Sequence, residues 1–241
     1  METDLMTRTD IVVTHGAWSS GWVWKKMRPR LAAAGHTLWT PSYTGVGERS
    51  HLAHPDIDLD THITDVVNML IWEDLTDVTL LAHSYGGMVG TGVLDRARSR
   101  VKSIIYLDAF VPGDGDSAMS LFGPEGSAEM QRRADEEGDG WKVTANPTPP
   151  DTDPIDIEWT LPRRMPQPIK TFSQPLVFTA PLPDVPHSYI YCLKSGPGDA
   201  FRPFALRAAS DVRWNYREID ASHNPHVTVP DELCAMLVDL I

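Results

Sequence analysis

The stretch Val78-Thr-Leu-Leu-Ala-His-Ser84-Tyr-Gly-Gly-Met-Val89 decides the fold, because an apolar run ends abruptly at a serine that two glycines follow. The apolar run predicts a buried strand, and the glycines predict a sharp turn into a helix. Such a turn exposes the serine hydroxyl and leaves room only for small residues. The usual pattern is Gly-x-Ser-x-Gly, and Ala82 stands in place of the first glycine. The alternative, in which Ser84 merely caps a helix, is open at this point.

Length, charge and cysteine content narrow the class of protein. The chain has 241 residues, enough for one large α/β domain with a substantial core. Its 33 acidic and 21 basic residues give a net charge of −12, and no Lys/Arg block interrupts them. We therefore expect no nucleic-acid partner and no membrane partner. Neither Cys192 nor Cys234 has motif spacing, and residues 1–10 lack the apolar core of a signal peptide. These features predict a cytoplasmic protein with reduced thiols, and a homodimer is compatible with them.

Apolar runs alternate with amphipathic stretches along the chain. This alternation predicts an α/β fold with a parallel sheet of about six strands flanked by helices, in a single domain over residues 1–241. The predicted strands are residues 11–14, 36–40, 77–83, 101–108, 188–193 and 214–219. The predicted helices are residues 21–34, a stretch that follows a cap at Asp60, and residues 88–98, 201–209 and 230–240.

A long segment, residues 112–186, separates two of the predicted strands. It contains most of the chain's 20 prolines and shows little regular periodicity. Connections of this length in a compact domain are usually functional, so we expect an irregular lid over a site at the carboxyl ends of the strands. The alternative is a disordered insertion, against which buried-type residues such as Trp159 and Phe172 argue.

Two further segments indicate acyl-transfer chemistry at Ser84. The first strand ends in Thr14-His-Gly-Ala-Trp18, a turn of small residues that can present a backbone N–H. The amides of Ala17 and Tyr85 would together form an oxyanion hole. The loop Asp220-Ala-Ser-His-Asn-Pro-His226 follows the last strand, so a histidine there comes last in the order Ser, Asp, His.

These motifs resemble the α/β-hydrolase superfamily, and within it the small esterases similar to plant methylesterases and hydroxynitrile lyases. The matching stretches are His15-Gly-Ala-Trp-Ser-Ser-Gly-Trp-Val-Trp24, Gly45-Val-Gly-Glu-Arg-Ser50, Ala82-His-Ser-Tyr-Gly-Gly87, and His223 with Pro230. The resemblance implies an α/β-hydrolase fold in which Ser84 is the nucleophile and His223 the general base. His226 is the competing candidate for the base.

The acidic partner of the histidine has two candidates. Plant relatives carry it after the penultimate strand, but the corresponding segment, Cys192-Leu-Lys-Ser-Gly-Pro-Gly-Asp199, has no carboxylate in register. Asp199 would need a loop shift, and it also suits the cap of a following helix. Asp108 ends the strand beside that of Ser84, where a carboxylate can orient an imidazole. We favour Asp108.

The resulting hypothesis is a carboxylesterase-like serine hydrolase that cleaves a small, largely uncharged ester through an acyl-serine intermediate, without cofactor or metal. Trp18 and Trp159 are expected to contact the substrate. The alternatives are a hydroxynitrile-lyase-type enzyme and a ligand-binding receptor on the same fold. Lyases of the family place a Thr near the oxyanion turn, where this chain has Ala17, whereas Lys194 matches a lyase feature.

Overall fold

The computed structural model describes residues 8–195 and 199–241. Residues 1–7, on which the expectation about a signal peptide partly rests, lie outside this range. The main sheet has six strands in the order β2-β1-β3-β4-β7-β8, and every neighbouring pair is parallel. Its strands are β1 (Asp10–Thr14), β2 (Thr37–Trp39), β3 (Val78–His83), β4 (Val101–Leu107), β7 (His187–Cys192) and β8 (Trp214–Ile219). The expected parallel sheet is confirmed.

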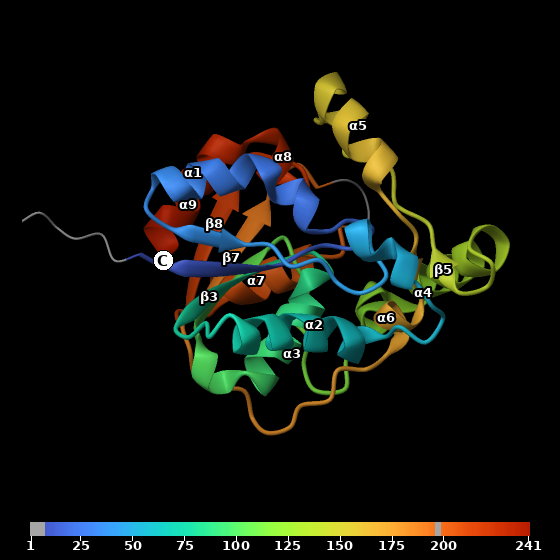
Figure 1. Cartoon of the computed structure of the whole chain (residues 1–241), viewed down its shortest axis with the longest axis horizontal. Helices are drawn as coiled ribbons and strands as arrows, with labels where there is room; N and C mark the ends of the chain where they lie inside the picture. The colour runs from blue at the N-terminus through green and yellow to red at the C-terminus, as the bar shows by residue number, and fades with distance from the viewer. Residues whose placement is uncertain (1–7, 196–198) are drawn as a thin grey trace, which may run out of the picture.

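Helices cover both faces of this sheet (Figure 1). The helices outside the long insertion are α1 (Met27–Ala33), α2 (Leu59–Trp72), α3 (Gly86–Arg96), α7 (Arg202–Ser210), α8 (Pro225–Thr228) and α9 (Pro230–Leu240), with 3-10 turns η1 (Gly21–Lys26), η2 (Gly47–Leu52) and η3 (Arg98–Arg100). Because successive strand side chains alternate between faces, Val12 joins one core cluster with α2, α3 and α7, whereas Ile11 and Val13 join another with α1 and α9. Within the described ranges, no helix is long and apolar enough to cross a membrane.

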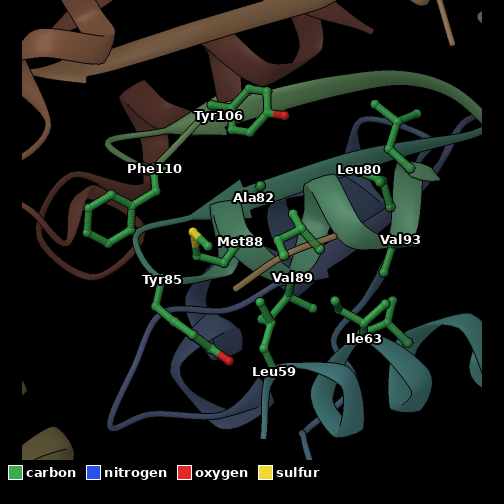
Figure 2. Packing of buried hydrophobic residues seen from close by; sticks show 14 of the residues in the cluster. Leu59, Ile63, Leu80, Ala82, Tyr85, Met88, Val89, Val93, Tyr106 and Phe110 are labelled. Carbon is green, nitrogen blue, oxygen red and sulfur yellow. The ribbon is translucent and has the colours of Figure 1, made fainter. Parts of the chain in front are cut away.

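The core around α3 holds the strand that carries Ser84. All residues of β3 are buried, as expected for a central strand of a parallel sheet. Figure 2 shows Val89 and Val93 of α3 lying between this strand and Ile63 of α2. Helix α2 is capped by Asp58, whose Oδ1 accepts a 2.9 Å hydrogen bond from the Thr61 amide. The predicted cap at Asp60 was therefore wrong by two residues.

Residues 112–186, hereafter the insert, are more regular than their proline content suggests. They form α4 (Ala118–Glu137), α5 (Pro154–Thr160), α6 (Lys170–Ser173), the turn η4 (Leu161–Arg163), and a two-stranded sheet of β5 (Lys142–Val143) and β6 (Gln167–Pro168). Many prolines of the insert lie in loops, where no helix or strand is interrupted. Others begin a helix, as Pro154 does, or follow a break such as Gly123 with φ of 78°. These elements gather beyond one end of the main sheet (Figure 1).

Candidate active site

Parallel register brings the ends of three strands together. Thr14 pairs with Ala82 across β1 and β3, and His83 pairs with Leu107 across β3 and β4. The residues that follow these strands therefore meet at one edge of the sheet. The sequence-predicted turn at residues 15–17, Ser84 and Asp108 all lie at this edge.

Ser84 occupies a strained turn between β3 and α3. Its φ is 59°, in the left-handed region that few non-glycine residues adopt. The two glycines after it are required by close backbone approach. A β-carbon at Gly86 would lie 1.9 Å from the Thr14 carbonyl oxygen, and one at Gly87 would lie 1.9 Å from that of Phe110. The turn can form only because both positions lack a side chain.

The substitution of alanine for the first glycine of the motif has a structural counterpart in α3. Gly90 faces Ala82, and a β-carbon at Gly90 would lie 3.0 Å from the Ala82 methyl carbon. The methyl group at Ala82 therefore fits because its neighbour has none. This pairing explains why the variant motif still supports the same turn.

His223 contacts both Ser84 and Asp108. Its Nδ1 lies 2.7 Å from Asp108 Oδ2, and its Nε2 lies 2.8 Å from Ser84 Oγ. Because an ionised carboxylate only accepts hydrogen bonds, Nδ1 carries the proton in the neutral imidazole, and Nε2 is free to accept from the serine hydroxyl. Burial raises the pKa of the Asp108 carboxyl, and its hydrogen bond with His223 partly offsets this rise. The arrangement can transfer the Ser84 proton to His223 and stabilise the imidazolium.

The two competing candidates have other contacts. Asp199 Oδ1 accepts hydrogen bonds from the amides of Phe201 and Arg202 at 2.9 and 3.2 Å, so it caps the start of α7. His226 is buried and stacks on Trp24, with ring centroids 4.4 Å apart. Burial lowers the pKa of His226 to about 3, which keeps this imidazole neutral.

Two residues that the sequence did not reveal hold the His223 loop. His83 Nε2 lies 2.7 Å from the His223 carbonyl oxygen, and because a carbonyl only accepts, His83 donates. Burial lowers the pKa of His83 well below its usual value, so this ring is neutral. Asp151 of the insert accepts hydrogen bonds from both the amide, at 2.9 Å, and the hydroxyl of Ser222. No sequence pattern predicts the contact of His83 with His223 or that of Asp151 with Ser222, because the partners are far apart in the chain.

The predicted oxyanion donors belong to two residues that line the cavity, and their amides have no partner in the described part of the chain. Within residues 8–195 and 199–241, neither the Ala17 amide nor the Tyr85 amide donates a hydrogen bond to another protein group. Both residues line the cavity that contains Ser84. Gly16 permits this approach, since a β-carbon there would lie 2.9 Å from His83 Nδ1 and 3.1 Å from Ser84 Cβ. Two free amides beside a serine hydroxyl can bind a developing oxyanion.

A cavity of about 350 Å³ opens above Ser84, between the sheet edge and the insert. Trp18 lines it, as expected. Trp159 does not belong to its wall and instead packs edge-on against Trp22, with ring centroids 5.6 Å apart. The sequence of the insert did not show whether Trp159 faces the cavity or packs against another side chain. Lys194 lines the cavity too, but its Nζ is paired with Asp220 Oδ2 at 3.2 Å.

Comparison with known proteins places the chain in a family. The model of the alpha/beta hydrolase family matches residues 11–236. A carbendazim hydrolyzing esterase from Nocardioides sp. (strain SG-4G) is 36% identical, over 96% of this chain and 99% of that protein. Methylesterase 3 from Arabidopsis thaliana is 29% identical over a stretch that covers 42% of this chain and 40% of that protein. The chain belongs to the alpha/beta hydrolase family. It is a carboxylesterase-like hydrolase of a branch resembling the plant methylesterases.

A solved structure agrees with the architecture. An extracellular alpha/beta-hydrolase from a Paenibacillus species, described as sharing structural and functional homology with tobacco salicylic acid binding protein 2, superposes with a TM-score of 0.81. The match covers 96% of this chain and 98% of that one, at 24% identity. At this identity the likeness concerns the fold.

Proposed function

We propose that the protein hydrolyses a small carboxylic ester through an acyl-serine intermediate, with Ser84 as nucleophile, His223 as general base and Asp108 as the acid that orients it. The observation that carries this proposal is the chain of two short hydrogen bonds from Ser84 Oγ through His223 to Asp108. Hydrogen-bond reach between nucleophile and base, with a third group orienting the base, characterises an activated serine.

Each step follows from the position of these groups. His223 Nε2 takes the proton as Ser84 Oγ attacks the ester carbonyl, and the amides of Ala17 and Tyr85 stabilise the oxyanion. The protonated His223 then gives its proton to the departing alcohol. Water repeats the sequence on the acyl-serine, with His223 again as base, and releases the acid. Chain groups and water supply every proton in this cycle.

The insert acts as a lid in this proposal. It forms one wall of the cavity and limits the access of water to the acyl-enzyme, which strengthens the electrostatic interactions inside. The relative from Nocardioides is named for the hydrolysis of carbendazim. Carbendazim and short-chain methyl esters are therefore the first substrates to test.

A covalent probe combined with kinetics tests the proposal. A fluorophosphonate should label the wild-type protein, and Ser84→Ala should abolish both labelling and ester turnover, the latter by several orders of magnitude. Ser210→Ala replaces an exposed serine that does not line the cavity, so this control variant should still be labelled. Circular dichroism checks that both variants are folded. Normal turnover by Ser84→Ala would refute the nucleophile assignment, and an unlabelled wild type would favour the receptor alternative.

A further inference from the structure

One basic side chain on the insert's wall of the cavity, that of Arg164, has no acidic partner among residues 8–195 and 199–241. Arg164 is half-buried and lines the cavity, and its one side-chain hydrogen bond is a 3.5 Å contact with Thr148 Oγ1. Three other basic residues of the insert are paired with carboxylates: Arg132 with Glu129 and Glu136, Lys142 with Asp139, and Lys170 with Asp56. Within the described part of the chain, no carboxylate lies within salt-bridge distance of Arg164.

Backbone contacts fix Arg164 beside the oxyanion turn. The amide of the next residue, Met165, donates a 3.2 Å hydrogen bond to the Trp18 carbonyl oxygen, and Gln167 Oε1 accepts one of 3.1 Å from the Trp18 amide. Trp18 directly follows Ala17, which lines the cavity and is one of the two proposed oxyanion donors. The segment that carries Arg164 is thus held against the end of the cavity where an ester carbonyl would bind.

The surroundings of Arg164 favour an anionic ligand. A second guanidinium, that of Arg133, lies near, with hydrogen bonds to the neutral acceptors Thr144 Oγ1 at 3.2 Å and Asn146 Oδ1 at 2.7 Å. Burial and the charge of Arg133 lower the pKa of Arg164. An arginine nevertheless stays charged in proteins, so a half-buried guanidinium here lacks compensation until a ligand supplies it.

The two acidic residues of the cavity wall leave this position free. Asp108 is engaged by His223, and Asp199 is engaged by Tyr191 Oη and by the amides of Phe201 and Arg202. Both come from the sheet edge rather than from the insert. A ligand can therefore meet the guanidinium of Arg164 without displacing an internal carboxylate.

We propose that Arg164 binds a free carboxylate on the substrate, so that the preferred substrates are esters carrying a second, ionised carboxyl group. This inference rests on the proposed ester hydrolysis and narrows its substrate class. A planar guanidinium suits a carboxylate because it can donate two parallel hydrogen bonds. The proposed substrate, which carries an ionised carboxyl group, differs from the largely uncharged ester that was expected from the sequence.

Matched ester series test the proposal. The methyl monoesters of succinic, adipic and terephthalic acids provide three spacers, each compared with its carboxamide and its methyl-terminated analogue. For the spacer that fits, Arg164→Gln should lower kcat/KM for the carboxylate ester roughly tenfold to a hundredfold, mainly through KM, and leave the methyl-terminated ester unchanged. Arg163→Gln makes the same charge change at an exposed neighbour whose Nη1 donates to the Trp159 carbonyl, and should alter no ester preference.

A binding measurement separates this inference from the proposed function. Ser84→Ala should bind succinate, adipate or terephthalate more tightly than the matching monoamide by calorimetry, and adding Arg164→Gln should abolish the difference. If the esters are cleaved but neither kinetics nor binding depends on Arg164, this inference is wrong and the proposed function stands. If no ester is cleaved but binding depends on Arg164, the proposed function is wrong and the anion site stands. Failure in both assays overturns both.

Discussion

The sheet edge and the insert contribute to the same cavity but are built in different ways. At the sheet edge, Ser84 and Asp108 directly follow buried parallel strands, and hydrogen-bonded register fixes their separation. The insert combines the 20-residue helix α4 with several short elements. Buried residues such as Phe172 and Leu176 join it to the core of the main sheet. Polar contacts also join it to the rest of the chain, among them Asp151 with Ser222 and the 2.7 Å pair of Lys26 with Asp156.

This difference suits the sheet edge to holding the reacting groups and the insert to selecting the substrate. A strand end inside a packed sheet holds a side chain to within a fraction of an ångström, which proton transfer requires. Loops and short surface elements, such as those of the insert that line the cavity, tolerate changes of side chain more readily, so they suit the recognition of different substrates. Variants of the two regions test this division of roles.

The largest effect is expected at His223, the middle member of the hydrogen-bond chain at the sheet edge. His223→Ala should lower kcat on the order of 10⁴-fold or more, because members of one catalytic unit fail together. His226→Phe should lower kcat by less than about tenfold, because a phenyl ring preserves the stacking on Trp24. Side-by-side kcat values for the best ester decide the matter, and the reverse ranking would move the base to His226.

Two acidic residues of the cavity wall allow a second test. Asp108→Asn should cost about 10⁴-fold in kcat, because an amide no longer fixes the tautomer or stabilises the imidazolium of His223. Asp199→Asn should keep turnover and cost about 1 kcal/mol in the free energy of unfolding at most, as expected for a helix cap. Kinetics with urea denaturation of both variants distinguishes the roles. Loss of turnover only in Asp199→Asn would assign the acid to the other loop.

An intermediate effect is expected where the insert touches the catalytic loop. Asp151→Ala removes the acceptor for the Ser222 amide and should lower kcat by about tenfold or less, with KM for a small ester little changed. Asp153→Ala, an exposed carboxylate two residues on, serves as the control. Equal effects of the two variants would show that Asp151 does not position His223.

The smallest effect concerns acid stability. The folded-state pKa of His226 is lowered to about 3 by burial, below its ordinary value of 6.5. The unfolded chain therefore binds the extra proton between these values, so stability is complete above pH 6.5 and is lost as the pH falls. His226→Phe should reduce the slope of the unfolding free energy against pH by about 1.4 kcal/mol per pH unit near pH 5. Urea titrations from about pH 7 to pH 5 measure it. An unchanged slope would contradict the neutral, buried assignment.

Local patterns in the sequence were sufficient for the sheet and the elbow. Burial on both sides made β3 and β4 readable as apolar runs, and the glycines after Ser84 predicted the turn because no larger residue fits beside the Thr14 and Phe110 carbonyls. The residue that caps α2 was harder to predict from the sequence. The sequence analysis placed the cap at Asp60, whereas in the structure Asp58 caps α2 through its contact with the Thr61 amide.

By itself, the sequence determined the order of strands and helices, the serine turn and the histidine loop, since each depends on residues adjacent in the chain. Only the tertiary structure decided which side chains face the cavity. Asp108 reaches His223 across 115 residues, Arg164 lines the wall that Trp159 was expected to line, and His83 holds the His223 backbone across 140 residues. Periodicity cannot encode such contacts, because they depend on how loops from separate strands pack at the end of one sheet.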